Sequence, residues 1–436
     1  MNEVSPITGG TPALAEPAFI PVSRSDVLHV LLGPEMWGSQ HQQALAADVV
    51  NKIGLLRQHR SGVMLNQLSD VYDPFNPDDE TINIVEPSEM ERLEKRRVFN
   101  SRLKDLVTSA NYNELTPDEL EDVLNRASPD GVHVDVDFGE YDVRLMFYRG
   151  ESKTELKKRD LKKLFLKHYT TEVPTFERLF LAIKFKPEEL RVEELKREEG
   201  LDEKKARKKL HKMRKMLPPS VSTDHIYIKV FKDIPRDDVE MLFPNIRVKM
   251  KFTDKIRLGG SAFAGLLTWA VGTASKLLVA VALSPIMLAG ALLTGVGGVM
   301  YAQIRNIFIT RDKYRMQLAQ SLYFQNLANN QGALALMVDE AEEEDVKEEA
   351  LLYIHMLQMP VHVTQLETLR MRINAFLNEY FGIAVNFDIH DALERLMEHG
   401  LVTQSEKGDL RAMPLERANE HLREMWCRLC EAHRHS

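Results

Sequence analysis

The sequence predicts an α+β protein that is mostly helical, with a small, mostly antiparallel sheet, a two-helix transmembrane hairpin and a winged-helix-like C-terminal module. The first observation is a 44-residue stretch, 259–302, that holds a single charged residue. The second is a set of short alternating runs between 131 and 250, which is typical of strands. The third is the composition of the whole chain, where 28% charged residues and a mean hydropathy of −0.29 indicate material built for water.

Charge and cysteine content exclude several classes of protein. The net charge of −8 gives no general attraction to nucleic acid, so no nucleic-acid partner is expected. The only cysteines, Cys427 and Cys430, form no disulfide framework and suit a reducing compartment. Residues 1–18 are expected to be disordered and carry no basic, apolar leader.

Residues 19–130 are predicted to be a helical region. Apolar residues recur at helical intervals in Asp26–Leu32, Gln42–His59 and Ser88–Ser109. Thr116 and Glu119 have the spacing of a capping box, in which the two side chains satisfy free N–H groups at a helix start.

Residues 131–258 are predicted to form an α+β region. Its strands are expected where apolar and polar residues alternate or β-formers gather: Val132–Asp137, Tyr141–Tyr148, Arg178–Phe185, Ile226–Phe231 and Ile246–Met250. A charged helical insertion, 187–218, interrupts them and carries a basic run from Lys204 to Lys215. A solvated helix is one interpretation of this run, and contact with anionic headgroups is another.

The apolar stretch 259–302 is long enough for two membrane crossings, since one crossing needs about 20 residues. Ser284-Pro285 is the expected turn, and Lys276 would reach the interface from the last turn of the first helix. Small residues four apart favour close helix packing or a homo-oligomer. The residues assigned to the membrane are Gly259, Gly265, Trp269, Lys276, Pro285, Gly290, Gly295 and Ala302. A buried hairpin in a soluble domain is the alternative.

Basic residues on both sides of the hairpin predict that both termini lie in the cytoplasm. The expected location is therefore the bacterial inner membrane, as an integral two-pass protein, or the mitochondrial inner membrane if the chain is eukaryotic. Contact with anionic membrane lipids is assigned to basic residues before and after the hairpin: Lys157, Lys158, Arg159, Lys162, Lys163, Arg247, Lys249, Lys251 and Arg305.

The C-terminal part is predicted to be a helical connector, 303–345, a winged-helix-like module, 346–430, and a short tail, 431–436. The connector would hold a helix over Asp312–Met337 and an acidic junction, Asp339–Asp345, before a helix over Val346–Met359. In the module, Thr364 and Glu367 have capping-box spacing, and a helix from Asp388 to Gly400 precedes a β-hairpin. The acids of that helix disfavour DNA, so a protein-binding role is preferred.

Some of these runs resemble a known family. They are Phe19–Ser23, Phe147–Gly150, Tyr227–Pro235, Met241–Met250 and Ser321–Asn330, the last two lying on either side of the apolar segment. With that segment they resemble the Transmembrane protein 143-like family over about residues 19–425. The resemblance implies a membrane protein whose shared domain has no assigned function, and it transfers no catalytic residue.

No phosphate-binding loop, nucleophile elbow or zincin motif occurs, so no catalytic, cofactor or metal residue is assigned. Cys427 and Cys430 with the nearby histidines are too closely spaced for a two-pair zinc site, which leaves metal binding there undecided. The leading hypothesis is a non-enzymatic, membrane-anchored scaffold that recruits an unidentified protein partner. The alternatives are a lipid-binding protein or enzyme with a pocket near the basic clusters, and a small oligomeric channel.

Overall fold

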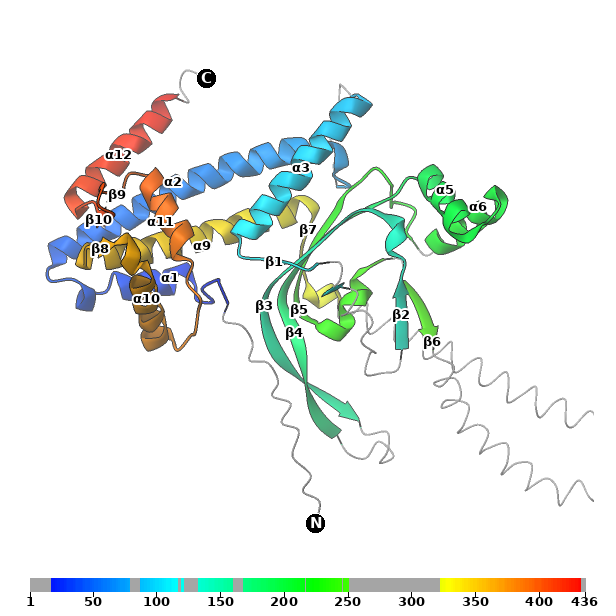
Figure 1. Cartoon of the computed structure of the whole chain (residues 1–436), viewed down its shortest axis with the longest axis horizontal. Coiled ribbons are helices and arrows are strands. Elements are labelled where there is room, and N and C mark those ends of the chain that lie inside the picture. The colour runs from blue at the N-terminus through cyan, green and yellow to red at the C-terminus, as the bar shows by residue number, and fades with distance from the viewer. Residues whose placement is uncertain are drawn as a thin grey trace, which may run out of the picture.

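The computed structural model describes residues 17–78, 87–116, 119–120, 132–159, 168–215, 217–244, 246–250 and 322–432. Within these ranges the protein is mostly helical, with an antiparallel sheet beside the helices (Figure 1).

Three helices open the described part of the chain. Helix α1 spans Arg24–Leu31, α2 spans Gln40–Tyr72 and α3 spans Glu89–Ser109, while the short 3-10 helices Pro34–Met36 and Asp73–Phe75 adjoin α2. Serine side chains cap all three helix starts, and Ser88 with Glu91 forms a full capping box. The predicted Thr116–Glu119 capping contacts are also present, with the Thr116 N–H donating to the Glu119 carboxylate over 2.9 Å.

The main sheet has five antiparallel strands in the order β1-β3-β4-β5-β7. Their bounds are Asn113–Glu114 for β1, Tyr141–Arg159 for β3, His168–Phe185 for β4, Tyr227–Pro235 for β5 and Asn326–Asn329 for β7. Strands β3 and β4 run on past β5, so their far ends project from the sheet as a two-stranded hairpin (Figure 1). Strands β2, Val132–Val136, and β6, Ile246–Met250, form a separate pair.

The predicted charged insertion is a helical hairpin between β4 and β5. Helix α5 spans Glu188–Glu199 and α6 spans Glu203–Arg214, and Gly200 adopts the left-handed conformation that ends α5. The two helices share a small apolar core of Val192, Leu195, Ala206 and Leu210. The 3-10 helices Phe138–Glu140 and Arg236–Leu242 lie at other turns of the sheet region.

The C-terminal part starts with the long helix α9, Asn330–Gln358. It continues through β8, Val361–His362, the 3-10 helix Val363–Gln365, α10, Leu366–Phe381, and α11, Ile389–Glu398. Strands β9, Val402–Gln404, and β10, Asp409–Ala412, form a hairpin that also pairs with β8, and α12, Leu415–Ala432, follows. The predicted order of helices followed by a β-hairpin is therefore observed.

Two of the hydrophobic cores share α2 and α9. The first joins the beginning of α2 and the end of α9 to α1, α10, α11 and α12. The second joins the end of α2 and the beginning of α9 to α3 and one face of the sheet. The opposite face of the sheet packs its own aromatic core around Phe176, Phe185 and Phe243. We refer to the elements around the first core as the C-terminal unit.

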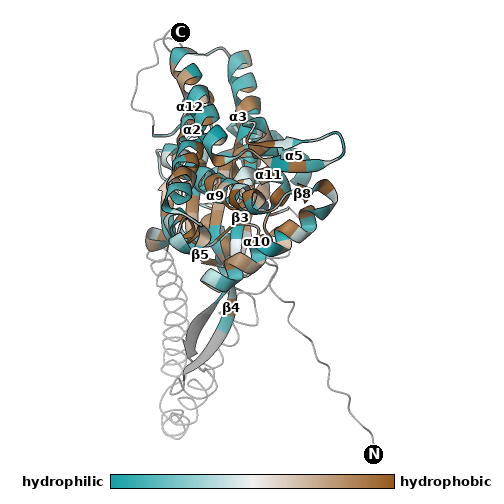
Figure 2. Ribbon diagram, turned by 90° about the vertical axis from the view of Figure 1, so that its left-hand side faces the viewer, coloured by the Kyte–Doolittle hydropathy of each residue, from teal (hydrophilic) through white to brown (hydrophobic). Residues whose placement is uncertain are grey.

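The prediction of a transmembrane hairpin, and with it the two-pass inner-membrane location, is corrected by the structure. No helix within the described ranges is both long and apolar enough to cross a membrane, and residues 259–302 lie outside those ranges. Helices α2 and α9, of 33 and 29 residues, exceed the length of one crossing. Both helices nevertheless mix polar and apolar residues (Figure 2). Both also bury charged side chains inside the fold, Arg57 in α2 and Lys347 in α9.

The prediction for the segment after 303 is also wrong in two places. Residues 326–329 form strand β7 against β5, where a helix over Asp312–Met337 was expected. The acids of Asp339–Asp345 lie in the middle of α9 and do not mark a junction between two helices. Several of these acids pair with residues that are distant in the sequence, as Glu342 does with Arg24 and Asp345 with Arg57, while Glu344 pairs with the nearby Lys347.

Candidate functional site

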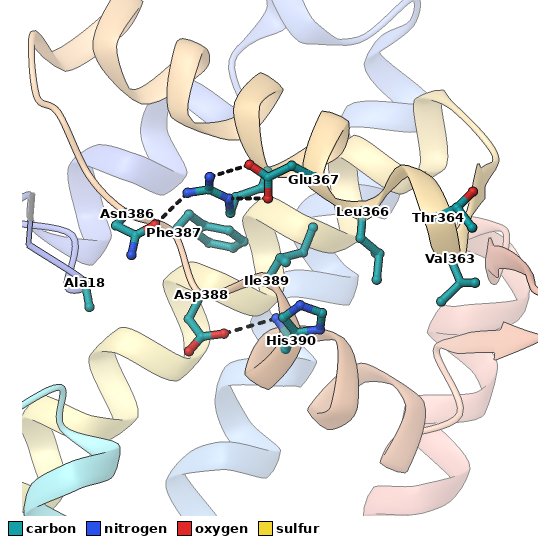
Figure 3. A pocket seen from close by; sticks show the side chains of 11 residues that line it. Ala18, Val363, Thr364, Leu366, Glu367, Asn386, Phe387, Asp388, Ile389 and His390 are labelled. Carbon is teal, nitrogen blue, oxygen red and sulfur yellow. Dashed lines mark hydrogen bonds and ion pairs between the residues drawn. The ribbon is translucent and has the colours of Figure 1, made fainter.

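A hollow of about 440 Å³ opens where α10 and α11 begin (Figure 3). The buried side chains of Phe387 and Ile389 line it, and Glu367, Arg370 and His390 stand at its polar edge. One small space is therefore surrounded by the starts of α10 and α11, the connection between β8 and α10, and Ala18 from the first part of the chain. A capping box was predicted for Thr364 and Glu367. In the structure, His362 and Gln365 make the capping-box contacts instead.

The carboxylates around this hollow already have partners. Asp388 caps α11 by accepting hydrogen bonds from the N–H groups of His390 and Asp391, over 3.1 and 3.3 Å. Glu367 accepts from the Arg370 guanidinium over 2.9 Å, which holds the pKa of Glu367 below its usual range. Both carboxylates are therefore held by contacts within the protein.

A second hollow, of about 340 Å³, lies between α2, the end of α11 and α12. Leu56, Met425 and Leu429 supply its apolar lining. The ring of His59 meets Trp426 edge-on at 6.1 Å, and the Arg60 guanidinium pairs with Glu398 over 3.2 Å. We call this hollow the α2–α12 groove. It offers apolar surface bordered by charge, which is the composition of many binding sites.

Apolar side chains continue from the groove onto the surface of α2. Leu55 and Val63 are 48% and 38% exposed. They stand four residues before and four residues after His59, which places all three on one face of the helix. Across the groove, Trp426 is 37% exposed. The accessible apolar surface is therefore wider than the hollow itself.

A buried ion cluster lies beneath the groove. The Arg57 guanidinium of α2 contacts Glu349 of α9 over 2.5 Å and Asp345 over 3.5 Å. Arg395 of α11 contacts Asp345 over 3.2 Å and Glu349 over 3.3 Å, and it also pairs with Glu348. These contacts hold three helices together where the two cores meet.

Burial dominates the electrostatics of this cluster. It raises the pKa of Glu348 to about 8 and that of Asp345 to about 6, although the nearby guanidinium groups act in the opposite direction. The ring of His399, which also lines the groove, lies 3.6 Å from the carboxylate of Glu349. The side chain of His399 therefore lies between the ion cluster and the surface of the groove.

Metal ligation finds no support in the described part of the chain, where no group of three or more His, Cys, Asp or Glu side chains could hold an ion. Cys427 and Cys430 are exposed free thiols on α12.

The residues predicted to contact lipid do not gather at one described site. Lys157, Lys158 and Arg159 end strand β3, opposite residues 168–170 of β4. Arg247 and Lys249 belong to β6 and pair with β2. The remaining assigned lipid contacts, Lys162, Lys163, Lys251 and Arg305, lie outside the described residues, as do all eight residues assigned to the membrane.

The groove and the ion cluster were missed by the sequence analysis. One signal in the sequence marks Arg57, which stands four residues after Ile53 and so lies on the apolar face of the predicted helix. No local signal pointed to Arg395, because its partners are about 50 residues away in the sequence. A further signal in the sequence was the aromatic residue Trp426 in the C-terminal segment.

The chain is a mostly helical α+β protein with two hollows on its C-terminal unit. Residues 176–332 match a family described as Protein of unknown function (DUF3754). This match runs from β4 to the start of α9 and leaves both hollows outside it. No solved structure matches the chain. The resemblance to the Transmembrane protein 143-like family stays a prediction.

Proposed function

We propose that this chain is a non-enzymatic protein that binds a partner through the α2–α12 groove. The observation that carries the proposal is the continuity of the groove with exposed Leu55, Val63 and Trp426. Apolar and aromatic side chains around a hollow are the usual anchors of protein interfaces.

The partner best matched to this surface is an amphipathic helix with acidic flanks. A helix would place side chains at intervals of three, four and seven residues into a groove between two helices. The exposed Arg428 guanidinium lines the groove and has no ion pair with a described carboxylate, so it is available to an acidic side chain.

A lipid-binding role is the second candidate, and it rests on a different surface, the exposed lysines of α6. The groove itself favours a protein, because its apolar lining and its aromatic neighbour resemble an interface more than a headgroup site.

Site-specific photo-cross-linking tests the proposal in the full-length protein. A benzophenone side chain replaces Leu55 beside the groove in one variant and Met371 of α10 in a control, since Met371 is also exposed, at 54%. We expect one protein adduct that forms from position 55 and is absent from position 371. Adding Trp426→Ala should reduce that adduct several-fold.

The same experiment can contradict the proposal. If the same adduct formed in equal yield from positions 55 and 371, the partner's contact with the chain would not be specific to the groove. An adduct from position 55 that is unchanged by Trp426→Ala would show that the groove does not hold the partner.

A further inference from the structure

A row of four lysines lies along the solvent face of α6. Lys204, Lys208, Lys212 and Lys215 are all exposed and are separated by four, four and three residues, a spacing that places them on one helix face. The opposite face is buried, through Ala206, Leu210 and Met213. We call these four residues the lysine row.

Among the described residues the lysine row has no acidic partners, whereas its neighbours on α6 have them. Lys205 pairs with Asp202, Arg207 with Glu203 and Glu188, and Lys209 with Glu199. No lysine of the row makes an ion pair or hydrogen bond with a residue that the structure describes. A local concentration of positive charge therefore persists on a chain whose net charge is −8.

The α5–α6 hairpin holds this row in a fixed orientation. Arg191 of α5 and Arg214 of α6 both contact the fully buried carboxylate of Glu140, over 3.1 and 3.0 Å. The hairpin lies at the edge of the molecule, away from the C-terminal unit (Figure 1). Because the apolar face of α6 is already buried, the helix can meet a surface only through its charges.

We propose that the lysine row binds the surface of an anionic lipid bilayer. This is a peripheral contact that needs no membrane-spanning segment. Lysine is depleted at protein interfaces, which disfavours a protein occupant. The row also has no interleaved aromatic residue on which single-stranded nucleic acid could stack. Compact, hydrated ammonium groups suit the diffuse negative charge of a headgroup layer.

The expected strength follows from the number of lysines. Each lysine near an anionic membrane surface strengthens binding about fivefold. Removing two of them should therefore weaken binding by about 25-fold. Because the contact is purely electrostatic, added salt should also abolish it.

The test measures co-sedimentation of the full-length protein with vesicles of phosphatidylcholine mixed with phosphatidylserine. The test variant is Lys208→Gln with Lys212→Gln, from the centre of the row. The control, Lys407→Gln with Arg417→Gln, removes the same charge from two exposed residues of the C-terminal unit. We expect a loss of about 25-fold for the test variant alone, with thermal unfolding of both variants unchanged.

Three results would overturn the proposal. The two variants could bind equally, which would remove any role for the row. The wild-type protein could bind phosphatidylcholine vesicles as well as the mixed ones. A DNA duplex or an acidic peptide could compete for the row more strongly than the mixed vesicles, which would assign it to another partner. Because the lysine row lies outside the α2–α12 groove, these outcomes leave the proposed function untouched.

Discussion

At the scale of single residues, Glu348 belongs to a cluster whose formal charges do not balance. The three carboxylates of Asp345, Glu348 and Glu349 face the two guanidinium groups of Arg57 and Arg395, and the His399 ring lies beside Glu349. One proton on the carboxylates would neutralise this set. The raised pKa of Glu348, about 8, makes it the residue that holds this proton near neutral pH.

We expect Glu348→Gln to weaken the pH dependence of folding. The carboxyl group has a pKa of 4.5 in an ordinary setting and about 8 in the folded protein, so the folded state binds the proton more strongly between these values. The stabilisation from this proton is complete below the lower value and is lost as the pH rises through the higher one. Glutamine cannot lose a proton, so the variant should avoid a loss on the order of 2 kcal/mol between about pH 6 and about pH 8.

Urea unfolding at both pH values measures this effect. Glu394→Gln provides the control, because Glu394 is an exposed residue of the same helix as Arg395. Its free energy of unfolding should depend on pH as in the wild type. If Glu348→Gln shows that same dependence, Glu348 does not hold the proton.

At the scale of elements, the α5–α6 hairpin depends on the close approach of a glycine to an arginine. A Cβ atom added at Gly139 would lie 2.7 Å from the guanidinium of Arg191. That guanidinium is buried and contacts Asp137, Glu140 and Glu194. Movement of the arginine would break its contacts with Asp137 and with the buried carboxylate of Glu140.

We therefore expect Gly139→Ala to loosen the hairpin at a cost of about 1–3 kcal/mol. Hydrogen exchange should accelerate in α5 and α6 and remain unchanged in α10 to α12. Gly62→Ala in α2 is the control, since nothing lies within 4 Å of the added Cβ. It should be neutral or slightly stabilising. Uniform acceleration across the chain would indicate global destabilisation and contradict a local anchor.

Prediction from sequence succeeded for elements whose signal is local. Ser88 with Glu91 opens α3, and alternation in residues 132–136 marks β2. Prediction failed where partners are distant. Residues Asn326–Asn329 form a strand by pairing with β5, which is about 100 residues away in the sequence. The α2–α12 groove is built by helices from opposite ends of the chain, a juxtaposition that no local pattern encodes.

At the scale of the whole molecule, α9 and α2 connect two cores whose other elements differ. The first half of α9 packs Leu334 and Met337 against α3 and the sheet, and its second half packs Leu351 and Ile354 in the C-terminal unit. The buried ion cluster lies on the same helix near the boundary between them. A helix forms cooperatively, so damage at one end is expected to reach the other.

This arrangement predicts a single unfolding transition for both cores. Leu334→Ala and Leu351→Ala each remove a fully buried side chain, one from each core, and each should cost about 2–5 kcal/mol. Met371→Ala, at a residue that is 54% exposed, should leave the melting temperature almost unchanged. Calorimetry of the full-length protein should show the one transition moving to lower temperature in both core variants. A second, unmoved transition in either variant would mean that α9 divides between two independent folding units, and the ion cluster would then be a hinge between them.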